Sequence, residues 1–128
     1  MKNLNALIID DSSVMRKIVE RCLRQSGIAI ATVYEAANGA EALAILDKSS
    51  MDVIFCDINM PIMGGLEFIR RLKDVPKARN VPIVMITTEG GEAHVVEALS
   101  SGARGYIRKP FTPEQMRDQV TPLLQGIK

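Results

Sequence analysis

The side chains of this chain that could do chemistry are acidic, and they follow apolar runs. Asp57 stands just past the run of residues 51–56, and Asp10 and Asp11 follow the run of residues 6–9. A carboxylate can act as a nucleophile and form a covalent acyl intermediate. Carboxylates gathered within about 4 Å repel one another by roughly 4 kcal/mol per pair at an effective dielectric near 20, so such a cluster needs a cation. Oxygen ligands without clustered His or Cys favour Mg²⁺ over Zn²⁺.

Two further residues stand where apolar runs end. Thr87 follows residues 81–86 and would supply a hydroxyl donor, and Lys109 follows residues 105–108 and would supply a fixed positive charge. This set suits phosphoryl transfer, which depends on positioning and on neutralising the phosphoryl oxygens. Asp57 would be the nucleophile, with Mg²⁺ and Lys109 holding the phosphoryl group. No glycine-rich nucleotide motif is present, so we expect a donor other than ATP that carries an already activated phosphate.

The elements that must position these residues are strands and helices in alternation. The predicted strands cover residues 6–9, 31–35, 51–56, 81–86 and 105–108, and a segment of helical apolar spacing follows each. Right-handed crossovers between neighbouring strands give an α/β fold with a parallel sheet and bring all strand carboxyl ends to one edge, where ligands bind. The least apolar strand, residues 31–35, is expected at the sheet edge.

Several helix ends can be predicted from local sequence. Asn38 with Glu41 three residues later is typical of a helix start, and residues 112–115 have the form of a capping box with proline at the first helical position. The last helix contains Pro122, where a missing N–H predicts a kink or a restart.

Length and charge set limits on the kind of protein. The 128 residues suit a single domain covering residues 1–128, and a net charge of +1 supports neither a nucleic acid nor a membrane surface as partner. The first apolar run is too short for a signal peptide, and no stretch is long enough to span a bilayer, so a cytoplasmic protein is expected. We also expect a monomer. Cys22 and Cys56 lie in apolar patterns and are expected to be buried free thiols.

Together these motifs resemble the receiver domain of two-component response regulators. They are Asp10-Asp11, Asp57-Ile-Asn-Met-Pro-Ile-Met-Gly64, Thr87 and Lys109-Pro110, in this order and spacing along nearly the whole chain. The resemblance implies a flavodoxin-like (βα)5 fold with strand order 2-1-3-4-5 and helices on both faces. It also implies a phospho-acceptor that assists its own phosphorylation and dephosphorylation, rather than an enzyme.

The resemblance implies roles for individual residues. Asp57 would accept a phosphoryl group from the phosphohistidine of a sensor kinase. Asp11, Asp57 and the main-chain carbonyl of Asn59 would ligate Mg²⁺, and Asp10 would act through water. Thr87 would bond the phosphoryl oxygen.

A second group of implied roles concerns switching and rate. Tyr106 would change rotamer from exposed to buried, and the Lys109-Pro110 bond would be cis. Separately, we hypothesise that Asn59 and Glu89, two residues beyond Asp57 and Thr87, tune how fast water hydrolyses the acyl phosphate. Thr88, where many relatives carry a small residue, departs from the family pattern beside Thr87.

The output is a finer expectation. Because the chain ends about where a receiver ends, and because of Tyr106, Asn59 and Glu89, it resembles the stand-alone chemotaxis type. Its partners would be a chemotaxis histidine kinase and the flagellar motor switch protein. The binding face would surround the fourth helix, the last strand and the last helix.

Other interpretations stay open at this point. A phosphatase of the haloacid dehalogenase kind would carry a second aspartate where this chain has Asn59, and a flavodoxin-like carrier would need a hydroxyl- and glycine-rich loop in place of Asp10-Asp11. A receiver from a non-chemotaxis regulator or a longer multidomain protein is a further alternative. Taken alone, Asp10-Asp11 would be a helix cap and Tyr106 a half-buried strand aromatic.

Overall fold

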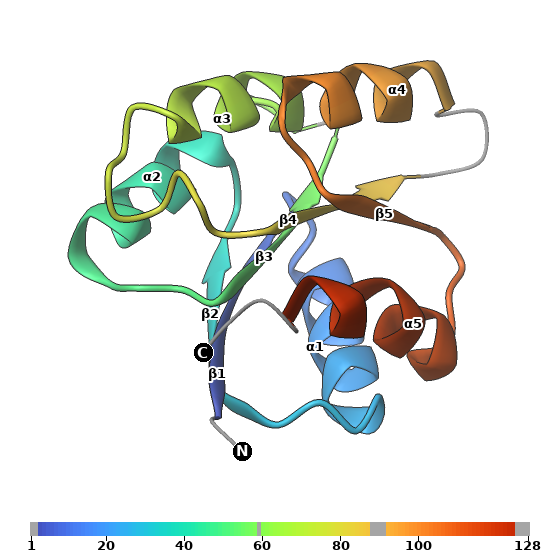
Figure 1. Ribbon diagram of the computed structural model, residues 1–128. Coiled ribbons are helices and arrows are strands. Elements are labelled where there is room, and N and C mark those ends of the chain that lie inside the picture. Colours follow the sequence, from blue (N-terminus) through green and yellow to red (C-terminus); the bar gives the residue numbers. More distant parts are fainter. Residues whose placement is uncertain (1–2, 59, 88–91, 125–128) are drawn as a thin grey trace.

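A computed structural model describes residues 3–58, 60–87 and 92–124. Within these ranges a five-stranded parallel sheet alternates with five helices, and the strand order is β2-β1-β3-β4-β5 (Figure 1). The strands are β1 (Leu4–Ile9), β2 (Ile30–Ala36), β3 (Val53–Asp57), β4 (Ile83–Thr87) and β5 (Gly105–Arg108); the helices are α1 (Ser13–Gln25), α2 (Gly39–Lys48), α3 (Gly65–Leu72), α4 (Glu92–Ser101) and α5 (Pro113–Leu124). The predicted flavodoxin-like (βα)5 fold is confirmed.

Helices cover both faces of the sheet, with α2, α3 and α4 on one face and α1 and α5 on the other (Figure 1). Successive strand side chains point to opposite faces, so each strand contributes to two cores. On β3, for example, Ile54 and Cys56 pack in the core under α2, α3 and α4, while Val53 and Phe55 pack in the core under α1 and α5. A strand covered on both faces must be apolar throughout, which explains the uninterrupted run before Asp57.

Strand boundaries differ slightly from the predicted ones. β3 begins at Val53 rather than at residue 51 and includes Asp57, and β4 begins at Ile83 because Val81 and Pro82 precede the ladder. Pro82 has no N–H for a ladder bond, although its carbonyl accepts a hydrogen bond from the N–H of Ile54 at 3.0 Å. The prediction that the least apolar strand lies at the sheet edge is confirmed by β2.

The predicted helix starts are confirmed. The side chain of Asn38 accepts a hydrogen bond from the N–H of Glu41 at 3.0 Å. Thr112 and Gln115 form a reciprocal capping box, in which each side-chain oxygen accepts the other residue's N–H, at 3.1 and 2.9 Å. Of the kink or restart predicted at Pro122, the restart is wrong for the described residues, since α5 continues through that proline to Leu124. The kink stays a prediction. So close to the described end of the helix, the proline removes one backbone bond without ending the helix.

No helix among the described ranges is long and apolar enough to cross a membrane.

Candidate functional site

Three carboxylates meet at the carboxyl edge of the sheet. Asp10 follows β1 and Asp57 ends β3, and these strands are neighbours whose register pairs Ile9 with Cys56. Asp10, Asp11 and Asp57 each offer a carboxylate oxygen, and these atoms lie within 4.8 Å of one another. The predicted convergence of residues distant in the chain is confirmed. We call these three residues the acidic cup.

Lys109 supplies the positive charge of the site. Its Nζ lies 3.6 Å from Asp10 Oδ2, and its side chain is only 20% exposed. The main-chain N–H of Lys109 donates to the carbonyl of Thr87 at 2.7 Å, which ties the end of β5 to the end of β4. The Lys109-Pro110 peptide bond is cis, as the resemblance implies.

The three residues of the acidic cup differ in their exposure to solvent. Asp10 is 1% exposed, Asp57 is half-buried, and Asp11 is exposed. Asp10 Oδ1 accepts the N–H of Ser12 at 2.9 Å, whereas Asp10 Oδ2 is buried without a hydrogen-bond partner in the described part of the chain. A buried acceptor left unsatisfied is destabilising, so this oxygen is suited to a further electrostatic partner.

The charges of the site fit a divalent cation. At 4.8 Å and an effective dielectric near 20, each carboxylate pair repels by roughly 3–4 kcal/mol. Three ionised carboxylates and one ammonium leave an excess of about two negative charges. All the ligand atoms are hard oxygens, which Mg²⁺ prefers. The residues present therefore fit Mg²⁺.

The remaining predicted site residues vary in position. Thr87 ends β4 and is buried, in register with Arg108. Tyr106 on β5 is 40% exposed. Asn59, Glu89 and Thr88 lie outside the described residues. The switch roles of Thr87 and Tyr106, and the tuning roles of Asn59 and Glu89, stay predictions.

Cys56 adjoins the site but takes no part in its chemistry. Its side chain is fully buried, and its Sγ lies 3.3 Å from the carbonyl oxygen of Asp57, to which the thiol donates. Burial raises the pKa of the Cys56 thiol far above its ordinary value, and the negative charges of Asp57 and Asp10 raise it further. Both effects disfavour the thiolate, which is the nucleophilic and metal-binding form of cysteine.

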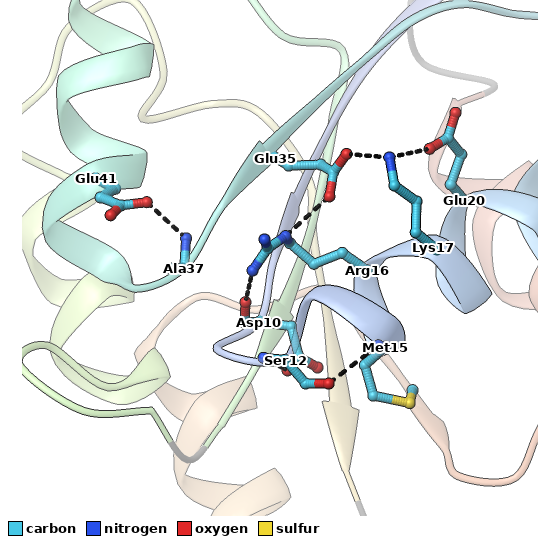
Figure 2. A network of polar contacts seen from close by, with 9 residues as sticks. All are labelled: Asp10, Ser12, Met15, Arg16, Lys17, Glu20, Glu35, Ala37 and Glu41. Atoms are coloured by element: carbon cyan, nitrogen blue, oxygen red, sulfur yellow. Dashed lines mark hydrogen bonds and ion pairs between the residues drawn. The ribbon is translucent and has the colours of Figure 1, made fainter.

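Arg16 and Glu35 also adjoin the site, although no motif in the sequence singles them out. Arg16 extends from α1, and its Nη1 donates to the carbonyl oxygen of Asp10 at 2.6 Å (Figure 2). Its Nε donates to Glu35 Oε1 on β2 at 2.9 Å. The spacing from Asp10 to Arg16 gives only a weak signal, because the Glu35 contact depends on how α1 packs beside β2.

An open hollow of about 490 Å³ adjoins the exposed side of the acidic cup. Asp11 lines it, together with Ile58, Met60, Leu66 and His94. The hollow lies between the segment after β3 and α4. It leaves the Asp11 side of the acidic cup accessible from solvent.

A five-stranded sheet of this order, carrying an acidic cup and a lysine at its carboxyl edge, defines a receiver. Residues 6–121 match the family model described as response regulator receiver domain, and the chain belongs to this family. It is a signalling protein rather than a conventional enzyme.

Several proteins to which this chain is similar along nearly its whole length are named as chemotaxis proteins. The chain is 40% identical over 122 residues to a chemotaxis protein CheY homolog of Campylobacter jejuni, covering 94% of this chain and 92% of that protein. It is 39% identical to chemotaxis protein CheY1 of Helicobacter pylori, covering 94% and 97%. The high-resolution structure of chemotaxis response regulator CheY4 of Vibrio cholerae superposes with a TM-score of 0.83 at 36% identity, covering 96% of this chain and all of that one.

Proposed function

We propose that this chain carries signals in a phosphorelay, with Asp57 accepting a phosphoryl group from the phosphohistidine of a sensor histidine kinase. The observation that carries the proposal is the meeting of the Asp57 carboxylate with those of Asp10 and Asp11, together with Lys109, whose Nζ lies 3.6 Å from Asp10 Oδ2. In this arrangement Lys109 and a cation bound by the carboxylates would hold the phosphoryl dianion beside Asp57.

The transfer step begins with attack by an Asp57 carboxylate oxygen on phosphorus. The bond between phosphorus and the imidazole nitrogen of the donor breaks, an acyl phosphate forms on Asp57, and the imidazole leaves with a proton from solvent. Hydrolysis reverses the modification, because water attacks phosphorus, releases inorganic phosphate and restores the carboxylate. Lys109 offsets the growing charge on the phosphoryl oxygens.

Asp11, Asp57 and the main-chain carbonyl of Asn59 would hold Mg²⁺, with Asp10 acting through water. The bound ion would neutralise negative charge on the carboxylates and on the incoming phosphoryl group. Asp10 contributes a buried charge that favours a cation, and its hydrogen bond from Ser12 fixes one carboxylate oxygen in place.

Thr87 and Tyr106 would convert phosphorylation into a change of surface. The Thr87 hydroxyl would bond the phosphoryl oxygen, and Tyr106 would move from exposed to buried. Asn59 and Glu89 would set the rate of acyl phosphate hydrolysis. A new charge with several acceptor oxygens stabilises the conformer that can bond to it, so phosphorylation shifts an existing equilibrium.

The output surface would be the face of α4, β5 and α5, and the pathway would be chemotaxis. Val96 and Leu99, three residues apart on α4, are 65% and 41% exposed, and Tyr106 on β5 is 40% exposed. Exposed apolar side chains on adjacent elements suit a protein partner. The relatives named as chemotaxis proteins support a chemotaxis kinase as donor and the flagellar motor switch protein as target, in the cytoplasm.

Incubation with acetyl phosphate, with and without Mg²⁺, tests the acceptor by intact mass. We expect one phosphoryl adduct that requires Mg²⁺ and is absent from Asp57→Asn. Asp47→Asn, which changes an exposed aspartate on α2, is the matched control and should be modified like the wild type. An adduct that persists in Asp57→Asn would place the nucleophile elsewhere.

Transfer from purified phosphorylated kinases tests the pathway. We expect the chemotaxis kinase of the same organism to phosphorylate Asp57 faster than its other sensor kinases do. Faster transfer from a different sensor kinase would assign the receiver to a non-chemotaxis pathway.

A further inference from the structure

Arg16 connects three elements that meet at the acidic cup. Its guanidinium bonds to the Asp10 carbonyl at 2.6 Å and to Glu35 Oε1 at 2.9 Å, so one rigid group joins α1, the end of β1 and β2 (Figure 2). The Arg16 side chain is 17% exposed and that of Glu35 is 28% exposed. Partly buried pairs are less screened by water and salt than exposed pairs.

The bond from Arg16 closes a small hydrogen-bonded ring around the segment that carries two of the carboxylates. Within this ring Asp10 Oδ1 accepts the N–H of Ser12, and the carbonyl of Ser12 accepts the N–H of Arg16 at 3.0 Å. The Ser12 side chain also caps α1 by accepting the N–H of Met15 at 3.2 Å. On the opposite side, the N–H of Asp10 donates to the Ala36 carbonyl at 3.0 Å. The main chain of Asp10 is therefore held from both sides.

The charge of Arg16 and its hydrogen bonds predict opposite effects on cation binding at the acidic cup. As a positive charge close to the acidic cup, Arg16 disfavours a second cation there. As a donor of one hydrogen bond to the Asp10 carbonyl and one to Glu35, it fixes the main chain from which the Asp10 and Asp11 carboxylates project. The hydrogen bonds to the Asp10 carbonyl and to Glu35 favour the geometric role, because neither is a contact with a carboxylate of the acidic cup.

We infer that Arg16, oriented by Glu35, is a positioning residue that holds the segment carrying Asp10 and Asp11 in the arrangement that binds Mg²⁺. The inference rests on the proposed function, because it assigns to this pair the support of the proposed metal ligands. Partners that orient metal ligands commonly change affinity by about 10- to 100-fold when they are removed.

Lys17 provides a matched control. It neighbours Arg16 in α1 and also bonds Glu35, with its Nζ 2.8 Å from Glu35 Oε2, but its described contacts go to Glu35 and Glu20 (Figure 2). Arg16→Gln and Lys17→Gln each remove one positive charge and one bond to Glu35. Only Arg16→Gln also removes the bond to the Asp10 carbonyl.

The test is calorimetric titration of the unphosphorylated protein with Mg²⁺. We expect the Kd to rise about tenfold in Arg16→Gln and to stay within about twofold of wild type in Lys17→Gln. Arg16→Lys keeps the charge but cannot bridge both acceptors, so its Kd should rise as well. Thermal unfolding in EDTA separates a general loss of stability, which both Gln variants share, from the loss of Mg²⁺ affinity.

Each outcome decides a different claim. An Arg16→Gln Kd equal to or below that of Lys17→Gln overturns the positioning role. If Arg16→Gln fails to fold, Arg16→Lys decides: a wild-type Kd in that variant overturns the role, and a raised Kd supports it. Absence of Mg²⁺ binding by the wild type overturns the metal part of the proposed function, and the positioning role with it.

Discussion

Replacing Gly65 by alanine tests how closely α3 must approach the phospho-acceptor. Gly65 is buried at the first position of α3, and its N–H donates to the Ile58 carbonyl at 2.9 Å. A Cβ at this position would lie 2.5 Å from the main-chain oxygen of Asp57 and 3.0 Å from the Cα of Ile58. Because both atoms belong to the main chain, the segment after β3 must move away from the helix.

The expected loss of stability follows from this overlap. Overpacking a well-packed site is destabilising by about 1–3 kcal/mol, and the upper half of that range applies where main chain must shift. A loss of about 2–3 kcal/mol lowers the Tm of a domain of this size by roughly 10 °C. Displacement of the Asp57 main chain should also slow Mg²⁺-dependent phosphorylation by acetyl phosphate.

Gly39→Ala is the matched control for this experiment. Gly39 is likewise buried at the first position of its helix, α2, and its Cβ would also come within 2.8 Å of another residue. That residue is Met63, and all the contacts are to its side chain: Cγ and Sδ at 2.8 Å, which a change of rotamer can move, and Cβ at 3.1 Å. Urea unfolding should therefore show a smaller loss for Gly39→Ala than for Gly65→Ala, by about 1 kcal/mol or more. Equal unfolding free energies for the two variants would refute the reasoning from main-chain contact.

Three further predictions concern charge, backbone strain and pH. Asp11→Asn removes one repulsive charge at an exposed position, so without Mg²⁺ its unfolding free energy should rise by up to about 1 kcal/mol. Mg²⁺ should no longer raise the Tm of this variant, and an undiminished Tm increase would exclude Asp11 as a ligand. Ile62 is 83% exposed and has a φ of 70°, a conformation that asparagine tolerates better than a β-branched residue. Ile62→Asn should therefore raise the free energy of urea unfolding by about 0.5–1 kcal/mol. A lower unfolding free energy would contradict backbone strain at this position. The hydrogen bond from Lys17, and then that from Arg16, hold the pKa of Glu35 below its ordinary value of 4.5. The resulting stability is present above that pH and is lost as pH falls through the lower pKa of the folded state. In urea unfolding, the difference in unfolding free energy between wild type and Glu35→Gln should therefore shrink below pH 4.5, and a constant difference would contradict this cause.

The fold could be predicted because its strands and helices are marked by strong local signals. β3 is apolar throughout because it is covered on both faces, and the caps at Asn38 and Thr112 follow short-range rules. The restart predicted as one alternative at Pro122 does not occur, because the local rule for proline does not include its position within the helix. The strand order required the family resemblance, since alternation of elements does not decide which strands are neighbours.

The acidic cup could be predicted because parallel strands bring their carboxyl ends to one edge, and because the strand order implied by the resemblance makes the strands that carry Asp10 and Asp57 neighbours. Burial differences within the cup could not be predicted, because they depend on how the segment after β1 turns. The link from Arg16 to Glu35 was missed for the same reason. It joins a helix to an edge strand through side chains, and no sequence periodicity records such a contact.

The burial of both thiols has a practical consequence for measuring the switch. Cys22 and Cys56 are buried, and burial raises the pKa of each thiol. Maleimide probes react with exposed thiolates, so a single cysteine introduced at exposed Val96 on α4 would be labelled while both native cysteines remain in place. A fluorophore attached there would report movement of this face upon phosphorylation in a protein that is otherwise wild type.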